Sequence, residues 1–434
     1  MDIGTITLLM GAAIALLMML GVPLVFVTGS VAVVAALSVF GPNALPLIAS
    51  RIYSTVDNYA LISVPMFVLM AAILERAGVA KDLYNAMHVL SGRLPGGVAL
   101  QTMVAAVVMA AMTGIVGGEI MLLGMVALPQ MLRLGYDRKL AIGTICAGGS
   151  LGTMLPPSLV LIIYGLTASV SIGDLFVAAV GPGLLLAALY MAYILVRCAL
   201  NPAMGPPVSR DEALSTADKA KLMSGLILPV GVAVLVLGSI YGGVASVSEA
   251  AAVGVVGAML CAVVRRALTL ELMRDVLHQT MRICGTILWL TFGASALIGV
   301  YGLIGGTRFV GDLMVNLPLS PLQIIMVMML IVFVLGLVMD WIGICLLTMP
   351  IFVPIVITLG FDPVWFGVLF CLNVQIAYLS PPFGPAAFFL KSVAPPDIDL
   401  PEIFVAMLPF IGLQIVALTV LLLWPDLALW ALAA

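Results

Sequence analysis

Two stretches of the chain, PQMLRLGYDRKLAIGTICAGGSLGTMLPPS at residues 129–158 and PIVITLGFDPVWFGVLFCLNVQIAYLSPPF at residues 354–383, align without a gap at an offset of 225 residues. The positions that agree are a proline, a Gly-aromatic-Asp turn and a Pro-Pro pair: Pro129 with Pro354, Gly135 with Gly360, Tyr136 with Phe361, Asp137 with Asp362, and Pro156-Pro157 with Pro381-Pro382. This agreement in one register predicts an internal repeat.

The composition around these stretches is typical of a helical membrane protein. Of the 434 residues, 64% are hydrophobic and 9% are charged, whereas about 25% of residues are charged in an average soluble domain. Long unbroken apolar runs, in place of strict alternation, argue against a transmembrane barrel. The formal charge of −3 offers no basic face for phosphates, so nucleic acid is excluded as a partner.

Signatures of catalysis and of tightly bound metals are missing from the sequence. The six cysteines lie in or beside apolar stretches without CxxC spacing, and we expect them to be small buried hydrophobes. His88 and His278 are too few for a metal site, and no phosphate-binding glycine loop or nucleophile elbow is present. We therefore expect that the protein binds no cofactor and is not an enzyme.

Apolar runs predict where the chain crosses the membrane, because a crossing needs about 20 apolar residues. Residues 4–40 lack the basic start of a signal peptide and could form two spans or one kinked helix, broken near Gly21 and Pro23. Residues 79–93 and 265–282 mix charged and apolar residues at helical spacing and predict amphipathic helices at the membrane interface. Ordinary spans are predicted at 58–74, 175–197, 222–240, 249–264, 283–305 and 402–424.

Four other apolar segments do not fit simple crossings. Residues 97–132 and 321–359 are too long for one crossing and are interrupted midway, which predicts re-entrant helical hairpins that enter and leave on the same side. Residues 140–166 and 364–390 contain the two Pro-Pro pairs. Because consecutive prolines remove two backbone donors, each of these segments predicts two half-helices joined by an unwound turn.

A polar stretch at 201–221, NPAMGPPVSRDEALSTADKAK, predicts a cytoplasmic linker between two halves. The predicted organisation is as follows: N-terminal scaffold segments at 1–57, a first repeat at 58–200, the linker at 201–221, scaffold helices and an interfacial arm at 222–282, a second repeat at 283–401, and a C-terminal span at 402–434.

Basic residues orient the two repeats, because cytoplasmic loops are enriched in Lys and Arg. Both ends of the first hairpin are basic, with Arg76, Lys81 and Arg93 before it and Arg133, Arg138 and Lys139 after it. The second hairpin is flanked by Arg308 and by the Lys- and Arg-free TLGFDPVW. Threading the spans leaves only Arg51 and Arg308 outside, so the repeats are inverted.

The predicted fold is thus an all-α polytopic membrane protein with two inverted-topology repeats, re-entrant hairpins and broken helices. This arrangement is typical of secondary transporters, whose substrate and ion sites lie near mid-membrane where the repeats meet. Nothing in the sequence would bind ATP in the usual way, so we expect an ion gradient or a partner to supply the energy.

Both halves of the chain contain further motifs beside those of the repeat. The first half contains Arg133-Leu134-Gly135-Tyr136-Asp137, Gly148-Gly149-Ser150-Leu151-Gly152, Leu155-Pro156-Pro157-Ser158, Tyr164-Gly165, Ser171-Ile172-Gly173-Asp174-Leu175-Phe176 and Gly181-Pro182-Gly183; the second contains Asp340, Pro350-Ile351-Phe352-Val353-Pro354-Ile355, Gly360-Phe361-Asp362-Pro363, Phe366-Gly367 and Ser380-Pro381-Pro382-Phe383-Gly384. With these motifs, nearly the whole chain resembles the large membrane subunit of tripartite ATP-independent periplasmic (TRAP) transporters.

The resemblance implies an elevator-type, multi-pass carrier in a bacterial inner membrane. It implies sodium-driven import of an organic acid anion delivered by a periplasmic substrate-binding protein. A small four-helix membrane subunit would be a separate chain, and the expected partners are these two proteins, the solute and membrane lipids.

The resemblance also implies where ions and solute bind, between hairpin tips and broken helices. The implied sodium positions are Gly114, Gly152, Pro156, Gly336, Asp340, Ser380 and Gly384. The wider candidate site adds Thr113, Gly117, Gly118, Glu119, Pro157, Ser158, Pro381 and Pro382. Relatives usually carry several small hydroxyl residues at the first tip, where this chain has Gly117-Gly118-Glu119 after one threonine.

Two of four notable carboxylates are open to more than one interpretation. Glu119 could be a cation ligand or a proton carrier, and Asp340 could bind ion or solute, cap the returning helix, or do both. Asp137 and Asp362 are interpreted as helix caps. Alternative functions are a binding-protein-independent carboxylate or ion antiporter of related fold and, more remotely, an intramembrane enzyme or a channel.

Overall fold

The computed structural model describes residues 2–87, 94–114, 117–207 and 227–432, and these form helices and connecting turns without strands. The helices of the first half are α1 (Ile3–Met19), α2 (Leu24–Phe40), α3 (Leu45–Val56), α4 (Ser63–Arg76), α5 (Val79–Met87), α6 (Gly97–Thr113), α7 (Gly118–Arg133), α8 (Arg138–Ser150), α9 (Leu159–Ala168) and α10 (Ile172–Leu200). Short 3₁₀ turns are η1 (Pro42–Ala44), η2 (Tyr59–Ile62), η4 (Leu151–Thr153) and η5 (Pro202–Met204).

The second half repeats this order. Its helices are α12 (Ile227–Tyr241), α13 (Val247–Val264), α14 (Leu270–Leu303), α15 (Gly306–Val315), α16 (Pro321–Gly336), α17 (Trp341–Thr358), α18 (Pro363–Leu379), α19 (Pro385–Lys391), α20 (Leu400–Leu423) and α21 (Asp426–Leu429). Each of α12 to α20 starts 223 to 228 residues after a counterpart in the first half, with α3 and α4 together matching α14. The repeat therefore extends from α1 and α12 onward, beyond the predicted limits 58–200 and 283–401.

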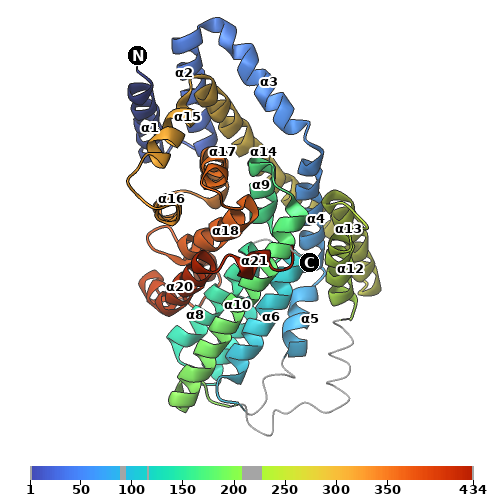
Figure 1. The fold of residues 1–434 in the computed structure, drawn as a ribbon. Helices are drawn as coiled ribbons and strands as arrows, with labels where there is room; N and C mark the ends of the chain where they lie inside the picture. Colours follow the sequence, from blue (N-terminus) through green and yellow to red (C-terminus); the bar gives the residue numbers. More distant parts are fainter. Residues whose placement is uncertain (1, 88–93, 115–116, 208–226, 433–434) are drawn as a thin grey trace.

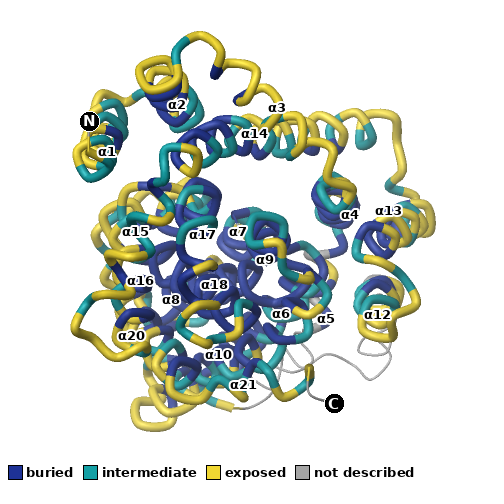
Figure 2. Tube along the Cα trace, turned by 45° about the horizontal axis from the view of Figure 1, so that its top comes forward, coloured by how far each residue is buried: buried dark blue, intermediate teal, exposed yellow. Residues whose placement is uncertain are grey.

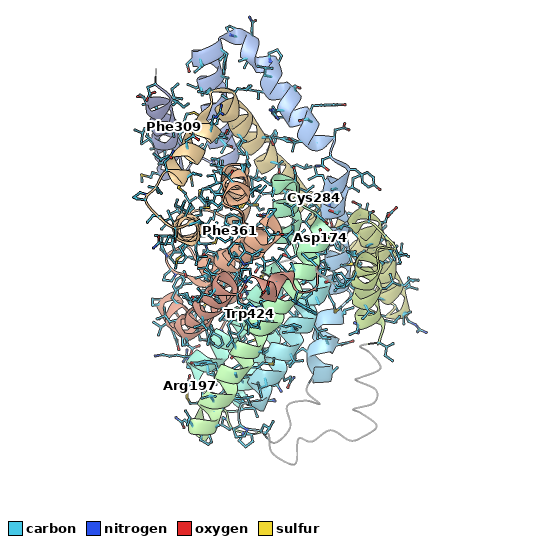
Figure 3. All side chains as sticks on the ribbon, in the orientation of Figure 1. Asp174, Arg197, Cys284, Phe309, Phe361 and Trp424 are labelled. Atoms are coloured by element: carbon cyan, nitrogen blue, oxygen red, sulfur yellow. The ribbon has the colours of Figure 1, made fainter. Side chains whose placement is uncertain are left out.

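The two repeats run through the molecule in opposite senses. The short helix α5, before the first hairpin, lies at the lower end of the molecule, whereas its counterpart α15 lies at the upper end (Figure 1). Along α10, Asp174 lies near mid-height and Arg197 at the lower end (Figure 3). The basic residues of the first half thus mark the end that we expect to be cytoplasmic.

The helices form two groups, which we call the peripheral wall and the central bundle. The wall consists of α1 to α4 and α12 to α14, and the bundle consists of α6 to α10 and α16 to α20 (Figure 2). Bundle helices are buried over much of their surface, while large apolar side chains such as Leu8, Val34 and Val264 are exposed on the wall. Six helices of the described chain are long and apolar enough to cross a membrane.

The structure decides one open prediction and corrects another. The run 4–40 forms two helices, α1 and α2, which was one of the two alternatives, because Gly21 adopts a φ of +77° and Pro23 is the N-cap residue of the second helix. The predicted arm at 265–282 is not a separate element, since Leu270–Leu303 is one continuous 34-residue helix. Its charged first turns and apolar remainder contain no proline or positive-φ glycine that would end the helix.

The amphipathic helix α3 was not predicted. It lies between α2 and α4 and, with α4, corresponds to the single helix α14. The predicted arm at 79–93 is described as far as Met87, as α5, and His88 lies outside the described residues, as do 208–221 of the predicted linker. His278 is exposed on α14.

The predicted helix caps and the predicted state of the cysteines are confirmed. Asp137 accepts a hydrogen bond from the Leu140 amide at 2.9 Å, and Asp362 accepts one from the Val364 amide at 2.6 Å. Both aspartates therefore cap the helix that follows each hairpin. Five of the six cysteines are buried and unpaired, and Cys284 is partly buried.

Candidate functional site

The first hairpin ends in a turn, residues 113–119, which we call the first tip; Ile115 and Val116 lie outside its described part. It lies against the unwound segment 151–158 between α8 and α9, which we call the first break and which contains a cis Pro156-Pro157 bond. Gly114 has a φ of +58°, and a Cβ there would overlap the Pro157 carbonyl oxygen. Its carbonyl accepts from the Leu159 amide at 3.5 Å. The hairpin thus covers freed backbone groups at the break.

Glu119 lies where the first tip meets the first break. Its side chain is 2% exposed, and its Oε1 accepts a short hydrogen bond from the Thr113 hydroxyl. A Cβ on Gly152 would lie 3.2 Å from the same Oε1, whereas Oε2 is buried and has no hydrogen-bond partner among the described residues. Three of the predicted residues, Thr113, Glu119 and Gly152, are therefore adjacent, and one carboxylate oxygen remains open for a cation or a proton.

Two helices from elsewhere in the chain close the other side of the first tip. A Cβ on Gly117 would lie 2.9 Å from the Phe389 ring of α19, and one on Gly118 would lie 2.9 Å from the Glu75 carboxylate of α4. Glu75 Oε2 also accepts a hydrogen bond from Gln279 of α14 at 3.4 Å. A wall carboxylate therefore faces the amino end of α7, where the helix dipole favours negative charge.

In the second hairpin, residues 337–340 connect α16 to α17, and we call them the second tip. They lie beside residues 380–384 between α18 and α19, which we call the second break. Asp340 is exposed and accepts a hydrogen bond from the Ile342 amide at 3.2 Å, so it caps α17. Gly336 lies directly against Ala377 of α18, where a Cβ would overlap the alanine methyl group. Ser380 is buried, and its hydroxyl donates to the Ile376 carbonyl at 2.8 Å.

The two breaks differ in exposure. Residues 151–158, including Pro156, Pro157 and Ser158, are all buried, whereas Pro381, Pro382 and Phe383 are exposed, although the bond between the two prolines is cis in both breaks. Gly384 is buried beside the Phe404 ring. The predicted residues thus form two clusters, of which the first is enclosed and the second is open.

Tyr378, which was not predicted, lies between the clusters. Its hydroxyl is buried and has no hydrogen-bond partner among the described residues, and the carboxylates of Asp340 and Glu119 are among the acidic groups in its surroundings. Its ring stacks on Phe389, with ring centroids 6.5 Å apart. The phenol therefore joins the surroundings of the two tips and offers a donor to an anion between them.

A buried polar pair marks the centre of the repeat. Gln375 of α18 donates from Nε2 to the Ser150 hydroxyl of α8 at 3.0 Å, and these residues are 225 positions apart, the offset of the repeat. Gln414 of α20 donates to the Gln375 carbonyl at 3.4 Å. These residues were not singled out in the sequence analysis. Two glutamines within long apolar runs could have indicated this contact, because a side-chain amide in such a run needs a hydrogen-bond partner.

Two inverted repeats, each with a hairpin tip against a broken helix, define a secondary transporter of the inner membrane rather than an enzyme. The chain belongs to the family described as "Tripartite ATP-independent periplasmic transporter, DctM component", whose model matches residues 11–427. It is the large permease component of a TRAP transporter.

Relatives and one solved structure agree with this assignment. The chain is 31% identical over 393 residues to the C4-dicarboxylate TRAP transporter large permease protein DctM of Pseudomonas aeruginosa, covering 90% of each chain. It is 29% identical to the ectoine/5-hydroxyectoine TRAP transporter large permease protein UehC of Ruegeria pomeroyi, covering 95% of this chain and 96% of the relative. It shares its fold with the Alcanivorax borkumensis YdaH transporter, with a TM-score of 0.64, 15% identity and 89% of each chain covered.

The contact between the first tip and first break predicts the effect of Gly114→Ala. The new methyl group would overlap the Pro157 carbonyl at a backbone conformation that L-residues rarely adopt. We expect loss of transport and a lower unfolding temperature of the purified protein, with strain of roughly 1–3 kcal/mol. Gly412→Ala on α20 is the control, because nothing lies within 4 Å of its Cβ position. Equal behaviour of the two variants would contradict the close contact.

Proposed function

We propose that this permease uses a sodium gradient to import an organic acid anion delivered by a periplasmic binding protein. The observation that supports the proposal most strongly is the enclosed first cluster, where an unpartnered Glu119 oxygen lies beside the unwound backbone of the first break. Unwound carbonyl groups and carboxylates are the ligands with which transporters of this architecture hold sodium.

The ligand set favours a hard monovalent cation. Around the first tip the available groups are oxygens, from the Thr113 hydroxyl, the Glu119 carboxylate and the backbone of residues 151–158. Among the described residues, no three His, Cys, Asp or Glu side chains gather as a transition-metal site would require. We therefore assign sodium to the first cluster, with Gly114, Gly152 and Pro156 as backbone ligands.

A second sodium ion is proposed at the second cluster, with Gly336, Asp340, Ser380 and Gly384. Because the Asp340 carboxylate caps α17, it fixes the second tip while still offering an oxygen to an ion. The open position of this cluster, with Pro381 and Pro382 exposed, suits the site at which a solute enters or leaves. The solute lies between the clusters, within reach of the Tyr378 phenol.

Transport by this chain would follow an elevator mechanism, in which the central bundle moves against the peripheral wall. The contacts between these groups are suited to that motion, since Glu75 of the wall meets the first tip and α14 borders α17. The wall would be held by a separate small membrane subunit. The relatives differ in the solutes that their names give, so the family alone does not fix the solute.

Reconstituted uptake tests the proposal directly. Proteoliposomes containing the permease and its small subunit should accumulate a labelled organic acid only when binding protein and an inward sodium gradient are both present. A panel of mono- and dicarboxylates identifies the solute. Full uptake without binding protein would contradict the tripartite function and favour an antiporter, and uptake unaffected by replacing sodium with potassium would contradict sodium coupling.

Two carboxylate variants separate ion coupling from helix capping. Asp340→Asn should raise the sodium concentration needed for half-maximal uptake at least tenfold. Asp362→Asn removes a helix cap of the same kind and should lower only the free energy of unfolding, by about 1 kcal/mol. Equal effects of the two variants would show that Asp340 is only a cap.

Glu119→Gln tests whether the buried carboxylate also exchanges protons. If Glu119 releases a proton before it binds sodium, uptake by the parent falls as the pH is lowered, because protons compete for the open oxygen. The amide variant cannot ionise, so its residual uptake should be flat across pH, while Glu249→Gln on the exposed start of α13 should retain the parental profile. An unaltered profile in Glu119→Gln would contradict this role.

A further inference from the structure

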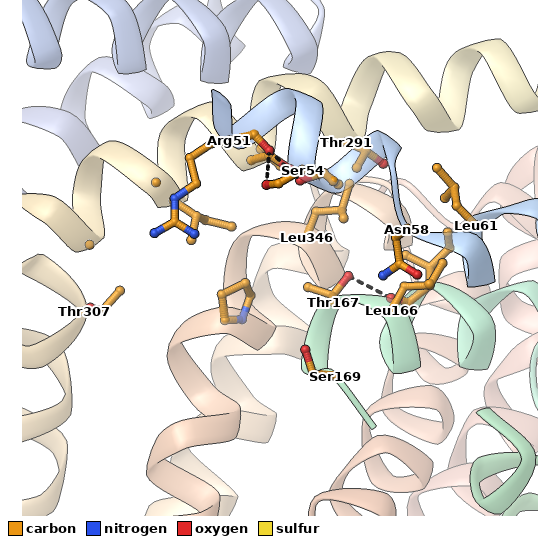
Figure 4. Close-up of a pocket in the computed structure, with 18 residues that line it drawn as sticks. Arg51, Ser54, Asn58, Leu61, Leu166, Thr167, Ser169, Thr291, Thr307 and Leu346 are labelled. Carbon is orange, nitrogen blue, oxygen red and sulfur yellow. Dashed lines mark hydrogen bonds between the residues drawn. The ribbon is translucent and has the colours of Figure 1, made fainter. Parts of the chain in front are cut away.

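A cavity of about 430 Å³ lies between the peripheral wall and the central bundle, away from both tips. Its wall side is formed by α3, Asn58 and Leu61 at η2, and α14, and its bundle side by the second half of α9 and the middle of α17, with Thr307 of α15 between them (Figure 4). Cavities of this size accommodate small organic molecules. None of the described residues of the two tips and the two breaks lines it, so among the described residues this cavity is separate from the two clusters.

Arg51 is the charged residue among those that line the cavity. Its side chain is exposed and extends from α3 toward the open side of the cavity (Figure 4), and its Cγ packs near Gly299 of α14. The guanidinium makes no ion pair with any carboxylate of the described chain. An arginine without a counter-charge, facing a cavity, is suited to bind a carboxylate through two parallel hydrogen bonds.

Polar side chains from four helices and the turn before η2 line the same cavity as Arg51. They include Ser54, Thr55, Asn58, Thr167, Thr291 and Thr307, and no acidic residue is among the described residues of the lining. The Thr55 hydroxyl donates to Ser295 of α14 at 3.2 Å, which joins α3 to α14 across one side. These neutral donors and acceptors suit the hydroxyl or carbonyl oxygens of a small organic acid.

The position of the cavity connects it to transport. Arg51 is one of two basic residues that the charge pattern places on the outer side of the membrane. Ile163, which lines the cavity, lies five residues beyond Ser158 of the first break, about 8 Å along α9. The cavity therefore lies between the expected outer surface and the enclosed cluster.

We propose that this cavity is an outer anion site, in which Arg51 binds the carboxylate of the solute before it reaches the hairpin tips. This inference rests on the proposed import of an organic acid. Because wall and bundle both contribute to the cavity, movement of the bundle would dismantle the site and release the anion.

Charged thiol reagents test the electrostatics of the cavity without requiring transport. Ser54→Cys is placed in a Cys284→Ser background, since Cys284 is the one partly exposed native cysteine in the described chain. In right-side-out spheroplasts with the complete transporter, the rates of modification by anionic sulfonatoethyl and cationic trimethylammonioethyl methanethiosulfonate are compared. The anionic reagent should be favoured.

Arg51→Gln should lower the anion-to-cation rate ratio about tenfold, because one nearby charge alters each local concentration roughly threefold in opposite directions. Arg308→Gln, which removes the other outer arginine without altering the lining, should change the ratio less than about twofold. An unchanged ratio in Arg51→Gln, equal changes in both variants, or no reaction from the outside would overturn the proposal.

Protection by small anions identifies what the site binds. Succinate, as the carboxylate probe, should slow the anionic reagent at Ser54→Cys, and Arg51→Gln should abolish this protection. Protection by glycerol phosphate but not by succinate would assign Arg51 to a lipid headgroup and overturn the proposal. Since these rates do not depend on sodium or on the binding protein, they remain interpretable if reconstituted uptake fails.

Discussion

The structure depends on one constraint: a backbone amide or carbonyl in the membrane interior must find a partner inside the protein. Each Pro-Pro pair frees such groups at the middle of a helix. At the first break, the hairpin brings Gly114 against the Pro157 carbonyl, which only a residue without a side chain can do. The buried first cluster is therefore a consequence of covering the break, and it places Glu119 beside unwound backbone.

The same constraint acts twice, but the two halves of the molecule differ. Each hairpin's returning helix packs on the second part of the opposite broken helix, α17 on α9 and α7 on α19. The Ser150–Gln375 hydrogen bond joins equivalent positions of the two repeats. Against this symmetry, the first break is buried and the second is exposed, so one sequence repeat supplies an enclosed site and an open one.

Much of this architecture could be predicted from the sequence, because proline pairs and interrupted apolar runs report directly on backbone breaks. The tip residues Thr113 and Glu119 could be expected to meet Gly152 of the first break, since a hairpin and its break are neighbours in the chain. The continuity of α14 could not be predicted, because the hydropathy changes along this helix while its backbone stays helical. The contact of Glu75 with Gly118 and the cavity beside Arg51 could not be predicted either, because both depend on how helices far apart in the sequence pack together.

The account rests on the two hairpins entering from opposite sides of the membrane. Arg133 and Thr358 are exposed at the last residues of α7 and α17 and are related by the offset of the repeat. With single cysteines at these positions, a membrane-impermeant maleimide added to intact spheroplasts should label Thr358→Cys and spare Arg133→Cys until the membrane is opened. Labelling of both positions from one side would contradict the inverted repeat and the mechanism built on it.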